Sequence, residues 1–121
     1  MTINGFTIRE LIIGQWGTAE GKFIHYNEVT QQHWSNIYWY HKYMAEKAEE
    51  AVEFYTNSGV FKDLLPSKQE RIEKYNRLAN FGLAQIIYRF NGQLLDWQPI
   101  YNNEKEWYKS QSTRKVLIEK V

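Results

Sequence analysis

Cysteine is absent from the 121 residues of this chain, and proline occurs only twice. The absence of cysteine excludes disulfide bonds, thiolate metal ligands and cysteine nucleophiles. No apolar run approaches the roughly 18 residues of a membrane span, and the first residues lack the basic and apolar pattern of a signal peptide. From these absences we expect a protein without membrane contact that is located in the cytoplasm.

The composition is typical of a soluble globular protein, with 43% hydrophobic and 24% charged residues. At this length we expect a single domain over residues 1–121, because two cores would leave each half near the lower limit of independent stability. The net charge of +1 conceals an asymmetry, since residues 1–60 have a balance of −3 and residues 61–121 a balance of +4. Within one fold these halves are expected largely to neutralise each other.

The N-terminal part of the chain predicts several short elements. Asn4 and Gly5 are typical of a tight hairpin turn, because both residue types tolerate positive φ. Thr7 and Glu10 have the spacing of a capping box, which predicts a brief helix directly after the hairpin. Residues 15–20 are expected to form a loop and residues 22–26 a short strand.

Two long segments have the apolar period of amphipathic helices. The first covers about residues 28–57 and ends at Gly59, which suits a left-handed cap. The second is expected to begin at Ser67, because its spacing to Glu70 again fits a capping box, and it ends at residues 91–92. Gly82 lies within the second helix and predicts a close approach of another backbone. The short connection predicts that the two helices pair antiparallel.

The last part of the chain is rich in β-branched residues at 115–121 and predicts a strand there. We expect a C-terminal hairpin, joined by residues 22–26 into a small sheet against the helices. The predicted fold class is therefore α+β, with two long antiparallel helices packed with a small antiparallel β-sheet or hairpin.

The residue types that carry catalysis or bind metals lack the required spacing. His33 and His41 share a helix face, but they lie roughly 12 Å apart along the helix axis, too far for one metal ion. His41 falls in the packing seam, where a hydrogen-bonded core residue is expected. No serine lies in a nucleophile elbow, and the glycines form no phosphate-binding loop. The sequence therefore predicts a protein that is not an enzyme and that holds neither a metal nor a cofactor.

Aromatic residues are concentrated in the first long helix, within residues 34–43. Trp39, Tyr40 and Tyr43 point away from the packing stripe, so one helix face cannot bury all of the rings. Either they are exposed, or the N-terminal segment covers them through Phe6, Trp16 and Phe23, which is the alternative we favour slightly. Because exposed Trp and Tyr dominate binding hot spots, these three residues are candidate anchors for a protein partner.

Basic residues provide two further candidate surfaces. Arg71, Lys74 and Arg77 recur at steps of three on the second helix and could flank the aromatic anchors as a charged border. Nearer the C-terminus, basic residues lie beside an aromatic ring, a combination that can hold a phosphate backbone and stack bases. This second set consists of Trp107, Lys109, Arg114 and Lys115.

Residues 94–108, with the sequence LLDWQPIYNNEKEWY, follow a helix that ends in Asn91 and Gly92. This stretch resembles a pattern in short accessory proteins of bacteriophages and mobile elements, in which a helix leads into Asp-Trp, an Asn-rich turn and a Tyr/Trp-Lys cluster. The resemblance lies within the C-terminal quarter of the chain and does not extend to the basic tail at 115–121. It implies an origin in a phage or mobile element. It does not identify any functional residue in this chain.

Small phage proteins without a catalytic motif often occupy a surface of a host protein, and some inhibit defence nucleases. The resemblance therefore implies stoichiometric binding to a host protein in the bacterial cytoplasm, in its sharpest form as an anti-CRISPR-like inhibitor of a defence nuclease. One alternative is a small nucleic-acid-binding protein that uses the C-terminal basic and aromatic residues. Another is a structural subunit that forms a homo-oligomer through the helix seam.

Overall fold

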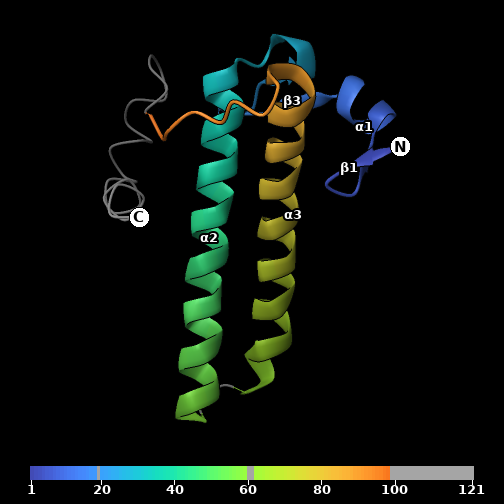
Figure 1. Ribbon diagram of the computed structural model, residues 1–121. Helices are drawn as coiled ribbons and strands as arrows, with labels where there is room; N and C mark the ends of the chain where they lie inside the picture. The colour runs from blue at the N-terminus through green and yellow to red at the C-terminus, as the bar shows by residue number, and fades with distance from the viewer. Residues whose placement is uncertain (19, 60–61, 99–121) are drawn as a thin grey trace.

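The computed structural model describes residues 1–18, 20–59 and 62–98. Two long antiparallel helices, α2 and α3, lie side by side, and the short N-terminal elements gather at the end where α2 begins and α3 ends (Figure 1). The elements are β1 (Thr2–Ile3), β2 (Phe6–Thr7), α1 (Ile8–Ile12), β3 (Gln15–Gly17), β4 (Phe23–His25), the 3-10 turn η1 (Tyr26–Glu28), α2 (Gln31–Ser58), the 3-10 turn η2 (Lys62–Leu64) and α3 (Leu65–Phe90). The α+β class with a helix pair and small antiparallel sheets is confirmed.

The predicted hairpin and capping box at the N-terminus are both confirmed. β1 pairs antiparallel with β2 across a turn in which Asn4 and Gly5 have φ values of 51° and 87°. Thr7 then caps α1, because its hydroxyl accepts the main-chain N–H of Glu10 at 3.2 Å. The Glu10 carboxylate accepts the Thr7 main-chain N–H at 2.6 Å in return. One residue therefore ends the hairpin and starts the helix.

The predicted loop at residues 15–20 is wrong in its first half. Residues 15–17 form β3, which pairs antiparallel with β4, so that Trp16 lies opposite Ile24. Both of these side chains pack against the buried core, and that packing explains why the segment is extended. The strand at residues 23–25 pairs with β3. The predicted C-terminal hairpin falls on residues 99–121, which lie outside the described residues.

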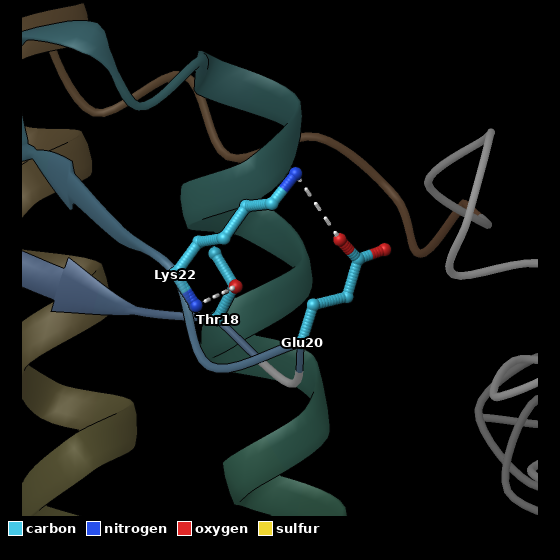
Figure 2. Close-up of polar contacts among 3 residues, drawn as sticks. All are labelled: Thr18, Glu20 and Lys22. Atoms are coloured by element: carbon cyan, nitrogen blue, oxygen red, sulfur yellow. Dashed lines mark hydrogen bonds and ion pairs between the residues drawn. The ribbon is translucent and has the colours of Figure 1, made fainter.

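The turn between β3 and β4 is held by polar contacts at its surface. The Thr18 hydroxyl accepts the main-chain N–H of Lys22 at 3.2 Å, and the Lys22 ammonium lies 3.7 Å from the Glu20 carboxylate (Figure 2). A main-chain bond from Thr18 to the Lys22 carbonyl, 2.8 Å long, continues the strand pairing into the turn. These contacts support a two-stranded sheet that would be marginal without the helices behind it.

The C-terminal ends of both long helices agree with the prediction, whereas both starts differ from it, and α2 begins at Gln31 and not at about residue 28. Thr30 caps α2 by accepting the main-chain N–H of His33 at 3.1 Å, and Gly59 ends it with φ of 70°. α3 ends at Asn91, which also has a left-handed conformation, with φ of 54°. The predicted start at Ser67 is wrong: α3 begins two residues earlier, because η2 leads directly into it and Pro66 suits the first turn.

α2 approaches α3 closely at Gly82, as predicted. A Cβ atom at this position would lie 3.2 Å from the main-chain nitrogen of Tyr38 and 3.4 Å from the carbonyl oxygen of Trp34. The first distance is shorter than an ordinary van der Waals contact and the second is at the lower limit of one, and both are to main-chain atoms. The helix pair therefore depends on the missing side chain at this position.

The core lies at the end of the helix pair where α2 begins and α3 ends, and the N-terminal elements cover it. Trp34 is fully buried there, and His41 is buried with its ring Nδ1 2.8 Å from the Ile37 carbonyl oxygen, which confirms its predicted core role. Phe81 contacts both core clusters, which contain Val29, Trp34, Ile37 and Ile86 in one and Phe6, Leu11 and Ala84 in the other. In the described part of the chain, no helix is long and apolar enough to cross a membrane.

Candidate functional site

The three predicted aromatic anchors on α2 are half-buried. Trp39 donates its indole N–H to the Leu95 carbonyl oxygen at 2.8 Å, so the segment after α3 covers part of this ring. The N-terminal cover that was expected for these rings lies elsewhere. Trp16 packs against Trp34 and Phe81, while the Phe23 side chain is 71% exposed. Trp39 is thus tied into the fold by a segment that the sequence had not assigned to it.

The three predicted basic residues on α3 differ in their surroundings. Arg71, Lys74 and Arg77 are all exposed, but only Lys74 and Arg77 border a hollow in the surface. The Arg77 guanidinium carbon lies 4.8 Å from the centroid of the Phe6 ring, which fits a cation–π contact. The other predicted basic and aromatic set, at residues 107–115, lies outside the described residues.

This hollow has a volume of about 300 Å³ and brings together residues that are far apart in the sequence. β2, β3, η1 and α3 each contribute to it. Its lining consists of Phe6, Trp16, Tyr26, Leu78 and Phe81 as an apolar floor, with Lys74 and Arg77 at the border. We call it the aromatic hollow.

Phe81 organises the floor of the aromatic hollow. Its ring centroid lies 5.1 Å from that of Phe6 in an edge-to-face arrangement and 5.3 Å from that of Tyr26. The Trp16 ring is stacked nearly parallel to it, at 6.4 Å. Behind them the fully buried Trp34 ring lies 5.9 Å from Phe81. Rings packed on one another in this way hold a fixed shape, so the hollow is formed before a ligand arrives.

Tyr26 is positioned from the opposite side by Gly14. The main-chain N–H of Tyr26 donates to the Gly14 carbonyl oxygen at 3.1 Å. A Cβ atom on Gly14, whose φ is 143°, would come within 2.6 Å of the Tyr26 ring. Burial raises the pKa of Tyr26 above its usual value of 10.0, so the phenol keeps its proton at neutral pH. The Tyr26 hydroxyl lies beside Gly14, and Tyr26 is part of the lining of the aromatic hollow.

The positive charges at the border have no carboxylate partner among the described residues. The ion pairs in that part of the chain join Lys22 to Glu20 and Lys47 to Glu50, away from Lys74 and Arg77. Hydrogen bonds from Thr7 hold the pKa of Glu10 below its usual value, and the charge of Arg77 lowers it further. Lys74 and Arg77 therefore form no salt bridge among the described residues, although the Glu10 carboxylate lies close enough to Arg77 to interact with its charge.

Arg89 differs from Lys74 and Arg77, because its side chain holds two elements of the fold together. Its guanidinium donates to the Gln85 side chain at 2.6 Å and to the Leu11 carbonyl oxygen at 2.7 Å. Gln85 donates to the same carbonyl at 3.0 Å, which joins α1 to α3. Arg89 borders a second hollow, of about 370 Å³, on the far side of Tyr26. Arg89 is thus held in place by neutral acceptors and keeps its charge at the border of that hollow.

The arrangement suits recognition of a group that combines an apolar or aromatic body with a negative charge. The floor can bury the apolar part, and the two cations can pair with the charge above it. Within the described ranges, no cluster of three or more His, Asp or Glu residues could hold a metal ion. The site therefore offers binding chemistry through fixed rings and cations.

Sequence reasoning found the two cations of this site but missed its floor. Trp16 and Tyr26 lie in short elements whose pairing was not predicted. Phe6 lies in the predicted hairpin but was expected to cover the α2 rings, and Phe81 was assigned no role. The only local signal was Gly14 beside Gln15 and Trp16, which marked a tight backbone and gave no indication of the ring that packs on it.

The chain was also compared with known proteins. The comparisons with protein-family models, with curated proteins and with solved structures found no match.

Proposed function

We propose that this protein acts by stoichiometric binding to another protein, with the aromatic hollow as the anchor site. The observation that supports this proposal is the pairing of a preformed aromatic floor with Lys74 and Arg77, neither of which has a carboxylate partner among the described residues. A pocket of about 300 Å³ can accept one aromatic or large aliphatic side chain of a partner. A carboxylate of the partner next to that side chain would form salt bridges with Lys74 and Arg77.

The proposed partner is a host protein in the bacterial cytoplasm. In its most specific form, the proposal names a defence nuclease as that partner. Support for this part comes from the resemblance of residues 94–108 to accessory proteins of phages and mobile elements. A binder of this kind needs no catalytic group, since occupying a functional surface is sufficient for inhibition. The position of the binding surface and the identity of the partner can be tested by separate experiments.

Affinity purification from bacterial lysate with the full chain, followed by mass spectrometry, identifies the partner. The variant Lys74→Gln/Arg77→Gln is expected to lose it, because both charges at the border are removed. Arg71→Gln is the matched control: it lies on the same helix and is exposed, but it does not line the hollow. Retention of the partner by Lys74→Gln/Arg77→Gln would contradict the aromatic hollow as the binding site.

A second pair of variants tests the α2 surface against the hollow. Trp39→Ala/Tyr43→Ala removes two of the aromatic anchors expected from the sequence. If this variant stays folded and loses the partner while Lys74→Gln/Arg77→Gln keeps it, the anchors lie on α2. The proposal expects the opposite result.

Direct binding of nucleic acid is the second candidate, because stacked rings beside unpaired cations also fit a single strand. It predicts an electrophoretic shift whose affinity falls steeply as salt rises. Lys74→Gln/Arg77→Gln would reduce that dependence on salt. A chain that gives no shift at low salt would exclude this candidate.

A further inference from the structure

After α3, residues 93–98 run across α2, and they are held there by side chains that bind their main chain (Figure 1). Gln31 donates to the Gln93 carbonyl oxygen at 2.7 Å, and Gln32 donates to the Asp96 carbonyl oxygen at 2.8 Å. Ser35 accepts the main-chain N–H of Leu95 at 3.0 Å. The Leu95 carbonyl in turn accepts the Trp39 indole N–H at 2.8 Å, as described above.

Asn36 makes the most specific of these contacts. Its side-chain oxygen accepts the main-chain N–H of Gln98 at 3.0 Å, and its side-chain nitrogen donates to the Gln98 carbonyl oxygen. One amide side chain thus pairs with both main-chain groups of a single residue, as a neighbouring strand would. We call Gln31, Gln32, Ser35, Asn36 and Trp39 the α2 ladder.

The α2 ladder is positioned by contacts of its own. Gln32 also donates to the Asn36 side-chain oxygen at 3.1 Å, and Ser35 donates to the Gln31 carbonyl oxygen at 2.8 Å. Ser35 and Asn36 are 0% and 2% exposed. This burial is measured with residues 93–98 in place, whereas the bonds of Gln32 to Asn36 and of Ser35 to Gln31 lie within α2 itself and limit the rotamers of the ladder whether or not a segment is bound.

These contacts recognise the backbone of the segment and are independent of its side chains. Selectivity for a sequence comes from two apolar positions: Leu94 packs against the core, and Trp97 is 7% exposed. The α2 ladder, together with the places where Leu94 and Trp97 pack, therefore recognises an extended peptide that carries Leu and, three residues later, Trp. This is the logic by which extended peptides bind other proteins, with main-chain bonds for affinity and side-chain sites for specificity.

We propose that the α2 ladder is a peptide-binding site that can receive residues 93–98 of a second copy of this chain. The same segment already fits the site, so an exchanged segment needs no new complementarity. Asn91 and Gly92, both left-handed at φ of 54° and 78°, form the bend that directs the segment back onto α2. A segment tethered so closely has an effective concentration on the order of millimolar, so binding between copies becomes dominant only when the intramolecular contact is weakened.

Two full-length variants with complementary defects test the proposal. Asn36→Ala breaks the ladder but keeps an intact segment, whereas Trp97→Ala keeps the ladder but removes the anchor of the segment. Each variant alone is expected to be a monomer of 14.6 kDa. A mixture of the two is expected to form a dimer of twice that mass in light scattering, with the intact segment seated on the intact ladder.

Amide hydrogen exchange reports the contact directly. In isotope-labelled Asn36→Ala, the Gln98 main-chain N–H is expected to lose its protection and to regain it when unlabelled Trp97→Ala is added. If Asn36→Ala does not fold, Trp39→Phe removes the bond to Leu95 with a smaller change in the ladder. A mixture that shows neither a dimer nor renewed protection would overturn the second copy as occupant.

A synthetic peptide separates the site from its occupant. The hexapeptide Gln-Leu-Leu-Asp-Trp-Gln, which has the sequence of residues 93–98, is expected to bind full-length Trp97→Ala. The same peptide with Ala in place of Trp is expected to bind at least tenfold more weakly, the change that roughly 1.4 kcal/mol produces. Peptide binding without dimer formation would overturn the second copy, and the absence of both would overturn the site itself.

Discussion

The guanidinium of Arg77 lies over the face of the Phe6 ring, 4.8 Å from its centroid, and joins the N-terminal hairpin to α3. Phe6 in turn meets Phe81 edge to face at 5.1 Å. The cation is therefore part of the packing on one side and part of the open border of the aromatic hollow on the other. This double role separates Arg77 from Arg71, which is exposed on the same helix and lies outside the hollow.

Arg77→Gln is expected to lower the free energy of unfolding by about 0.5–1 kcal/mol, the value of an exposed cation–π contact. Arg71→Gln should change it by less than about 0.5 kcal/mol, as is usual for surface substitutions. Urea denaturation of the two variants beside the wild type measures the difference. Equal values for both variants would show that the contact with Phe6 adds no stability.

Gly82→Ala is expected to destabilise the protein by about 1 kcal/mol. Alanine improves helix propensity by up to about 1 kcal/mol. That gain is outweighed because the new methyl group would lie 3.2 Å from the Tyr38 main-chain nitrogen and would force α2 and α3 apart, an overpacking cost of about 1–3 kcal/mol. Asn80→Ala, at an exposed position of the same helix, is the control and should be neutral or slightly stabilising. A Gly82→Ala protein more stable than the wild type would show that the helices can separate without cost.

Stability is expected to fall on mild acidification because of His33. Burial lowers the pKa of this imidazole from its usual value of 6.5, so the folded protein holds its neutral form. The unfolded chain therefore binds more protons between the lowered pKa and 6.5, and stability decreases as pH falls through that window. Melting temperatures of the wild type and His33→Gln between pH 7.5 and about pH 5 isolate the effect. Parallel curves for the two proteins would contradict it.

Thr7→Ala is expected to cost about 1 kcal/mol at neutral pH, the usual value of an N-cap, whereas Thr7→Ser should retain most of the cap. The difference should also depend on pH. Hydrogen bonds from Thr7 lower the pKa of Glu10 below 4.5, so the stabilising carboxylate is present above that value and is lost as pH falls through the lowered pKa. Thr7→Ala keeps the main-chain bond to Glu10 and loses only the side-chain contribution, so the gap between wild type and Thr7→Ala should narrow in acid by that contribution, which thermal unfolding at pH 7 and pH 3 can measure.

The features that were predicted correctly depend on a few consecutive residues. The turn at Asn4 and Gly5, the capping box at Thr7 and the end of α2 at Gly59 each follow from local dihedral preferences and short-range hydrogen bonds. The start of α3 was wrong, although Ser67 has a suitable spacing to Glu70. The backbone was already helical before Ser67, and a local pattern cannot show that.

The sequence by itself determined the helix pair, the N-terminal hairpin with the capped helix after it, and the positions of the cations at Lys74 and Arg77. Helical period, capping residues and charge spacing are encoded within one or two turns of chain, so they can be read before any packing is known. Only the tertiary structure decided which surface those cations border and what covers the α2 aromatics. The floor of the aromatic hollow is assembled from β2, β3, η1 and α3, and Trp39 is bound by a segment 56 residues away. Contacts at such separation depend on how all the elements pack together, which no local pattern in a single sequence records.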